Sequence, residues 1–133
     1  MFSIVNRKNI DVMCVETHDG VRGSSKAFKK LESKLSTLKQ RKFYGVLQGK
    51  PDDGIYRACV ERVIEDDRFK NDLDKWVIPG GKYARAKIKN WEENTDVIGS
   101  TFSEMAHQFQ IDGSRPVIEF YRSQKELLLF SPI

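Results

Sequence analysis

The sequence predicts an α+β fold, in which a curved antiparallel sheet carries two main helices on one face. Two segments have apolar residues at steps of three and four, the spacing of an amphipathic helix. Each is preceded by one short strand-like run and followed by two more. The order strand, helix, strand, strand therefore occurs twice, which predicts a duplicated βαββ unit. Two such units can join into one larger sheet whose other face is free to form a cleft.

The two predicted helices have end signals as well as apolar stripes. Residues 23–25 can cap the first helix, and Asn94 or Thr95 can cap the second, which ends before Gly113. The apolar stripe of the first helix consists of Phe28, Leu31, Leu35 and Leu38. That of the second consists of Ile98, Phe102, Met105, Ala106 and Phe109.

Six strands are expected around these helices. They are 12–16, 43–48, 56–63, 83–89, 117–122 and 127–130. Repeat one then covers residues 1–63, repeat two covers residues 76–133, and a charged linker with one helical turn covers residues 64–75. We expect one domain, because 133 residues suffice for a single hydrophobic core.

Composition indicates a cytoplasmic chain without a membrane segment. Hydrophobic residues make up 39% and charged residues 32% of the chain, and no apolar run approaches the roughly 18 residues of a membrane helix. The N-terminal residues lack the pattern of a signal peptide. Cys14 and Cys59 lie in apolar strand-like runs. They could pair, but buried free thiols in a reducing compartment are the preferred interpretation.

Alternation along residues 117–122 separates two faces. Ile118 and Phe120 share one face and suit packing under a helix, whereas Glu119 and Tyr121 share the other. We therefore expect Glu119 and Tyr121 to point away from the helices, into the cleft. Tyr83 is placed on the cleft side for the same reason, because the small residues that alternate with it can lie beneath a helix.

The carboxylate of Glu119 is the unusual feature of this strand, since a buried charge is costly unless something pairs with it. One interpretation is that Arg85, Lys87 or backbone donors on the same sheet face satisfy it. The other is that it is held for a ligand. Both remain open from the residues alone.

Common catalytic and metal-binding patterns are missing. His18 and His107 are the only histidines, and no zinc-binding or nucleophile motif occurs, so we expect no metal and no cofactor. The glycines of residues 78–83 precede a strand instead of opening a helix, which disfavours a phosphate-binding loop. No helix-turn-helix remains once the strands and helices are assigned, so direct sequence-specific reading of DNA is disfavoured.

Much of the net charge of +4 lies in and after the first helix. The basic residues there are Lys26, Lys29, Lys30, Lys34, Lys39, Arg41 and Lys42. This face is interpreted first as the solvated side of a helix, and second as a surface for a protein partner. No aromatic residues interleave the lysines on that face of the helix, so base stacking has no platform there.

Three motifs in the second half resemble one family. They are Ile-Pro-x-Gly-x-Tyr at residues 78–83, Glu-x-Tyr at residues 119–121, and a closing apolar strand that ends in Pro132 and Ile133. Their order and spacing are similar to those of the GyrI-like small-molecule-binding domains. These domains are related to the DNA gyrase inhibitory protein and to the effector domains of AraC-type and MerR-type multidrug regulators. The resemblance covers residues 76–133 closely and residues 1–75 loosely.

The resemblance implies pseudo-twofold symmetry, a central ligand cleft and roles for named residues. Glu119 would lie at the cleft floor and attract cationic aromatic ligands, with Tyr121 and Tyr83 as walls. Further wall candidates are Tyr44, Tyr56, Trp76, Trp91 and Phe109.

The first functional hypothesis is a stand-alone module that sequesters or senses aromatic, cationic or amphipathic compounds. An alternative, also implied by the family, is a hydrolase of cyclopropane-bearing electrophilic genotoxins, with Glu119 as its catalytic acid or base. A second alternative is a modulator of gyrase or of a transcription regulator, acting through the basic first helix.

Overall fold

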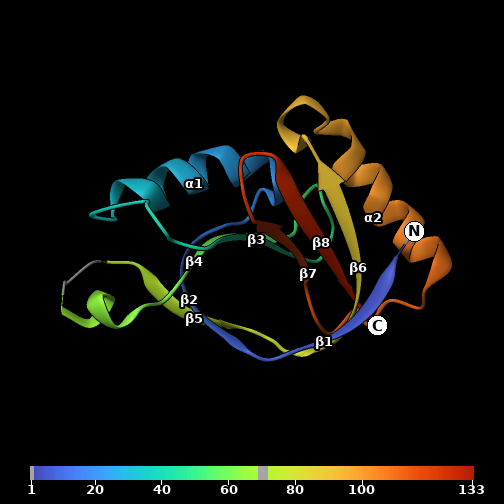
Figure 1. The fold of residues 1–133 in the computed structure, drawn as a ribbon, viewed down its shortest axis with the longest axis horizontal. Helices are drawn as coiled ribbons and strands as arrows, with labels where there is room; N and C mark the ends of the chain where they lie inside the picture. The colour runs from blue at the N-terminus through green and yellow to red at the C-terminus, as the bar shows by residue number, and fades with distance from the viewer. Residues whose placement is uncertain (1, 69–71) are drawn as a thin grey trace.

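A computed structural model describes residues 2–68 and 72–133 and confirms the α+β fold class. Within these residues, one eight-stranded antiparallel sheet curls into a half-barrel, and two α-helices lie on its outer face (Figure 1). The strands are β1 (Ser3–Arg7), β2 (Ile10–Thr17), β3 (Phe43–Gln48), β4 (Ile55–Glu61), β5 (Asp74–Ile78), β6 (Gly81–Lys89), β7 (Val117–Tyr121) and β8 (Glu126–Pro132). The helices are α1 (Ser24–Ser33) and α2 (Asp96–Gln108), with short 3-10 turns at Gly20–Gly23, Ile64–Arg68 and Trp91–Glu93.

The strand order shows the internal symmetry of the sheet. Across the described residues it runs β1-β6-β8-β7-β3-β4-β2-β5, so the two halves meet where β7 pairs with β3. Each half contains a hairpin and one further strand, in the order β3-β4-β2 or β7-β8-β6. The outermost strand of each half comes from the other repeat, since β1 pairs with β6 and β5 pairs with β2. This exchange of edge strands joins the two repeats.

The sequence-based prediction missed β1 and β5 and made the first helix too long. Both missed strands lie at the edges of the sheet, where polar residues interrupt the apolar alternation. The helix α1 ends at Ser33, and the backbone then tightens into 3-10-type bonds before leaving the helix. Leu35 still packs against the core beneath α1, but Leu38 is 46% exposed.

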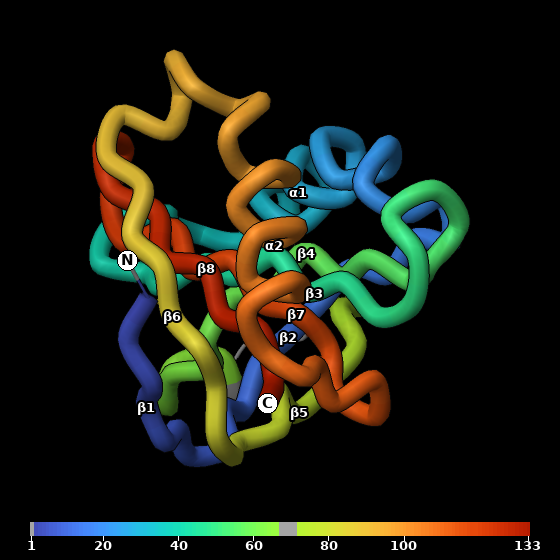
Figure 2. The backbone as a smooth tube through the Cα atoms, turned by 90° about the vertical axis from the view of Figure 1, so that its right-hand side faces the viewer, coloured from blue at the N-terminus to red at the C-terminus, as the bar shows by residue number. Residues whose placement is uncertain are grey.

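Each helix covers the sheet of its own repeat. The helix α1 contacts β2 and β4, and its Leu31 and Ala27 are buried against Met13 and Val60. The helix α2 contacts β6 and β8, over a core that contains Met105. Figure 2 shows α2 running along this side of the molecule. The central strands β3 and β7 are therefore left between the two helices.

A third core fills the inside of the curled sheet, on the face opposite the helices. Tyr44 stacks on Phe120 with ring centroids 4.8 Å apart, and Tyr83 meets Phe130 edge to face at 6.3 Å. Cys14 and Cys59 lie opposite each other on β2 and β4 in this core, both buried and without a disulfide. The inner face is thus occupied by the protein's own side chains.

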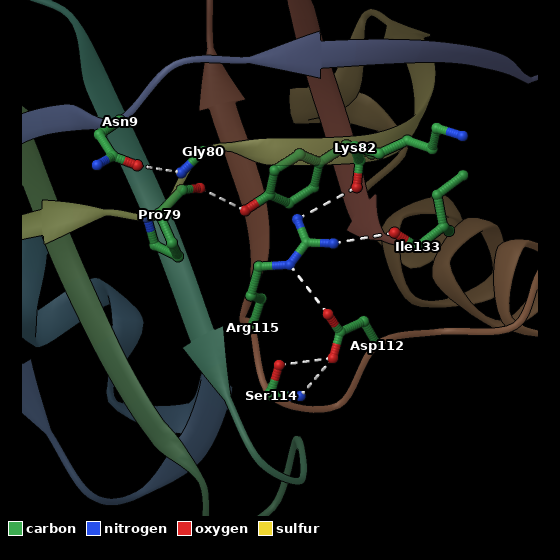
Figure 3. A network of polar contacts seen from close by, with 9 residues as sticks. Asn9, Pro79, Gly80, Lys82, Asp112, Ser114, Arg115 and Ile133 are labelled. Carbon is green, nitrogen blue, oxygen red and sulfur yellow. Dashed lines mark hydrogen bonds and ion pairs between the residues drawn. The ribbon is translucent and has the colours of Figure 1, made fainter.

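The turn before β6 is anchored by a polar network (Figure 3). The Gly80 amide donates to the Asn9 side chain at 2.6 Å, and the Tyr83 hydroxyl donates to the Pro79 carbonyl at 2.6 Å. Residues 78–83 therefore form a turn that leads into a strand, as the sequence indicated.

Arg115 fastens this turn to the end of the sheet. Its guanidinium donates to the carbonyls of Lys82 at 3.2 Å and Ile133 at 2.9 Å, and to the Asp112 carboxylate at 3.1 Å (Figure 3). Hydrogen bonds from Ser114 and Arg115 lower the pKa of Asp112 to about 2. These contacts of Arg115 therefore stabilise this corner of the fold.

Of the predicted linker 64–75, Ile64–Arg68 forms a 3-10 turn, and residues 69–71 lie outside the described residues. Lys26, Lys29 and Lys30 are exposed on α1, whereas Lys34 pairs with Asp72 at 3.0 Å. Among the described residues, no helix has the length and apolar character needed to cross a bilayer.

Candidate functional site

A cavity of about 700 Å³ lies on the helix-covered face, between α1 and α2 and above the central strands. Both repeats contribute to its walls, and most of the lining side chains are apolar. They are Val21, Ser24, Leu47, Gly49, Pro51, Tyr56, Trp91, Thr95, Ile98, Gly99, Phe102, Ser103, Ala106, Val117, Glu119 and Tyr121. This volume lies within the range of about 300–1,000 Å³ that is usual for small-molecule sites.

Glu119 lies at the centre of the sheet and on the floor of this cavity. It is paired with Gly45 of β3 on one side and Leu129 of β8 on the other. Its Oε1 atom accepts hydrogen bonds from the Tyr56 hydroxyl at 2.9 Å and from the Tyr121 hydroxyl at 3.1 Å. Among the described residues, its Oε2 atom has no hydrogen-bond partner and its carboxylate has no ion pair. One carboxylate oxygen is therefore fixed by the protein, and the other is available to a ligand.

Gly45 makes this arrangement possible. A Cβ atom at this position would collide with both the Tyr56 hydroxyl and Oε1 of Glu119. Because Gly45 has no side chain, the tyrosine can reach across β3 to the glutamate on the neighbouring strand.

The electrostatics of the three groups keep the tyrosines as donors. Burial raises the pKa of Glu119, while the hydrogen bonds from the two tyrosines act in the opposite direction. Burial and the nearby Glu119 charge raise the pKa of both Tyr56 and Tyr121. Both hydroxyls therefore stay protonated and point their protons at Oε1.

Aromatic side chains from both repeats frame the carboxylate. Phe28 of α1 contacts Tyr56 and Tyr121 edge to face, with ring centroids 6.3 and 5.4 Å apart. Trp91 meets Tyr121 at 5.1 Å, and its indole N–H donates to the Ser123 carbonyl at 3.0 Å. These contacts hold the rings in place around an otherwise apolar floor.

Replacing Tyr121 with phenylalanine is expected to have a modest effect that depends on pH. It removes one hydrogen bond that lowers the pKa of Glu119, so this pKa should rise further. The loss of one buried hydrogen bond should cost about 0.5–1.5 kcal/mol of folding free energy, which urea unfolding measures. The midpoint of any pH-dependent cation binding should move to higher pH, and an unchanged midpoint would contradict this assignment of the hydrogen bond.

The predicted orientation of β7 relative to the helices was wrong. Glu119 and Tyr121 point to the same side as α1 and α2, whereas Ile118 and Phe120 pack into the inner core. The physical reason is that each helix packs on strands of its own half, α1 on β2 and β4 and α2 on β6 and β8. The central strands stay uncovered on the helix side, while the curl of the sheet closes the other side.

The other predicted site residues divide between the two faces. Tyr56 joins Glu119 and Tyr121, and Trp91 lines the cavity. Tyr83, Tyr44 and Trp76 belong to the inner core on the opposite face. Phe109 also lies outside the cavity lining and packs against Phe2 at 6.2 Å.

The basic residues proposed as internal partners of Glu119 also lie on the opposite face. Arg85 is paired with Phe130 and donates to the Ser3 hydroxyl at 3.2 Å. Lys87 lies 3.8 Å from the Glu126 carboxylate. The partners of Glu119 are tyrosine hydroxyls, so its charge is not neutralised by either of these residues.

Sequence reasoning missed several walls of the cavity. Leu47 and Val117 share the cavity face with Tyr56, because the three are register partners across β3, β4 and β7. Knowledge of how β3, β4 and β7 pair would have shown that these three side chains lie side by side. Pro51 had no signal of its own in the sequence, whereas Gly99 could have been noticed as a glycine inside a predicted helix.

No protein-family model matches the sequence, and no curated protein matches it. Solved structures share its fold. An integron cassette protein from Vibrio cholerae has a TM-score of 0.71 and 14% identity, covering 98% of this chain and 94% of that chain. SAV2435, in a structure bound to tetraphenylphosphonium, has a TM-score of 0.64 and 13% identity, covering 99% and 93%. A hydrolase from Listeria innocua has a TM-score of 0.58 and 9% identity, covering 98% and 90%. These likenesses show the fold alone.

Proposed function

We propose that this chain binds aromatic, cationic or amphipathic small molecules in the cavity between α1 and α2. The observation that carries the proposal is Glu119, whose Oε2 atom lacks a partner among the described residues at the floor of an apolar cavity. A charged group in such a setting favours an opposite charge strongly. The chain would then be a GyrI-like binding module that sequesters or senses its ligand, and the fold shared with tetraphenylphosphonium-bound SAV2435 supports this.

The geometry indicates which ligand features would contribute most. A positive group near Glu119 would gain a charge-charge interaction, and an N–H donor would add a hydrogen bond at Oε2 of about 1.5–3 kcal/mol. The faces of Tyr121 and Trp91 would add cation–π and stacking contacts of about 1–2 kcal/mol. The exposed lysines of α1 should repel a cationic ligand only weakly, because salt screens their charges over about 8–10 Å.

The two tryptophans provide a direct test of where a ligand binds. Trp91 lines the cavity, whereas Trp76 lies on the inner face beneath the Arg57 guanidinium, 4.2 Å from its ring centroid. Titration with tetraphenylphosphonium is expected to change the fluorescence of Trp91. Trp76→Phe should keep the saturable signal, and Trp91→Phe should lose it while ligand still raises the melting temperature. A saturable signal that survives in Trp91→Phe and disappears in Trp76→Phe would contradict the proposed site.

Hydrolysis is a second candidate, favoured by the raised pKa of Glu119 and by its Oε2 atom, for which the described part of the chain offers no partner. Here Oε2 would accept a proton from a water molecule while the water oxygen bonds to a cyclopropane carbon. The ring C–C bond then breaks, its electron pair passes to the conjugated acceptor group of the electrophile, and that group takes the proton back from Glu119. The shared fold with a Listeria innocua hydrolase is compatible with it. Incubation with a cyclopropane-bearing electrophile, followed by product analysis, separates the two functions. Turnover that exceeds that of a Glu119→Ala variant would favour the enzyme, and binding without turnover would favour the module.

A further inference from the structure

Gly99 is an unusual residue at its position in the fold. It lies inside α2 (Asp96–Gln108), where glycine is the poorest helix former other than proline. Its φ angle is not positive, so the backbone there does not require glycine. A Cβ atom built on Gly99 would meet nothing within 4 Å, so packing does not require glycine either. Neither local conformation nor core packing accounts for a glycine at this position.

The space in front of Gly99 belongs to the ligand cavity. Gly99 lines it together with Thr95 and Ser103, which lie one helical turn before and after it. All three are exposed, in contrast to Met105, which anchors α2 to the sheet. At Gly99 the wall of the cavity is therefore bare helix backbone.

We infer that Gly99 determines the size of the ligand that the cavity accepts, an inference that rests on the proposed binding function. The missing side chain widens the cavity beside α2, so that a bulky cation with several rings can lie against the helix. A cation with a single ring needs only the floor around Glu119 and its aromatic frame. Gly99 therefore favours cations with several rings, although it does not contact the positive charge of the ligand.

A pair of cations tests this inference. Wild type and Gly99→Leu are titrated calorimetrically with tetraphenylphosphonium, which carries four phenyl rings, and with benzyltrimethylammonium, which carries one. Leucine is a good helix former, so the variant should fold at least as stably as wild type, and its melting temperature checks this. We expect affinity for tetraphenylphosphonium to fall by about tenfold or more and affinity for benzyltrimethylammonium to stay within about twofold.

Ser100→Leu is the matched control, because Ser100 is exposed on the same helix and outside the cavity lining. It should leave both affinities unchanged. If wild type binds both cations and Gly99→Leu binds them equally well, the size inference is wrong and the binding function stands. If wild type binds neither cation, the proposed function fails and the inference fails with it. Gly99→Ala should give a smaller loss in the same direction.

Discussion

Replacing Glu119 with glutamine is expected to weaken binding of an aromatic cation by about 10-fold to 100-fold. Glutamine keeps the size of the side chain and an oxygen that can accept from Tyr56 and Tyr121. It removes the negative charge, which is the main attraction for a cation in an apolar cavity. Calorimetric titration of tetraphenylphosphonium into both proteins measures the loss. Equal affinities of the two proteins would show that the charge of Glu119 does not contribute to ligand recognition.

The same substitution should stabilise the empty protein at neutral and alkaline pH. Burial raises the pKa of Glu119 in the folded state. The stability contributed by this group is therefore fully present below its unfolded pKa of about 4.3, and it is lost as pH rises through the folded pKa. Glutamine is uncharged throughout. The melting temperature of Glu119→Gln should exceed that of wild type at pH 8, and the two should converge near pH 4.

Binding should depend on pH with the opposite sign. A cation binds the ionised carboxylate, so the affinity of wild type should fall as the solution is acidified through the raised pKa of Glu119. Glu119→Gln should bind weakly at every pH. Glu104→Gln, which removes an exposed carboxylate on α2, is the control and should follow wild type in affinity and pH dependence. A pH dependence that persists in Glu119→Gln would assign it to another group.

Strand alternation separated Glu119 and Tyr121 from Ile118 and Phe120, and the structure keeps these pairs on opposite faces. Alternation could not say which face the helices cover. That depends on how far the sheet curls and on which strands each helix packs, and both follow from contacts between residues distant in sequence. The cavity therefore appeared on the side that local pattern had assigned to the core.

The same limit explains why the sequence could not place Tyr56 and Tyr83 on the correct face of the sheet. The sequence named Tyr56 only as a further wall candidate, and the pairing of β3 with both β4 and β7 is what places its hydroxyl beside Glu119. Tyr83 was assigned to the cleft because small residues alternate with it, and those residues do lie beneath α2. The face opposite α2 is the closed inner core, so Tyr83 is buried there.

The exchanged strands β1 and β5 also could not be predicted from the local sequence pattern. Each is five residues long and forms an edge of the sheet. Each pairs with a strand of the other repeat, so no hairpin signal within one repeat could predict its place. Helices with strong periodicity and central strands are specified locally, whereas edge strands depend on the completed sheet.

Replacing Gly45 with alanine should damage both stability and binding. The added Cβ atom would collide with the Tyr56 hydroxyl and with Oε1 of Glu119. Both groups line the cavity, but Tyr56 is only 1% exposed and is packed among the core residues beneath α1, so the carboxylate is the easier group to displace. We expect the carboxylate to be displaced and its hydrogen bond from Tyr56 to break. The free energy of unfolding should fall by about 1–3 kcal/mol, measured by urea denaturation, and cation affinity should fall by about tenfold.

A double substitution distinguishes this collision from a general effect of alanine in β3. Tyr56→Phe alone should destabilise the protein, since it removes a buried hydrogen bond to Glu119. In the Gly45→Ala background it should instead restore part of the lost stability, because the hydroxyl is one of the two groups that the new Cβ atom meets. Gly113→Ala is the control, because a Cβ atom there meets nothing within 4 Å. If the two destabilisations simply add, Gly45 does not hold the space for the contact between Tyr56 and Glu119. If they offset each other, the missing side chain at Gly45 is what allows tyrosines of both repeats to orient one carboxylate toward the cavity.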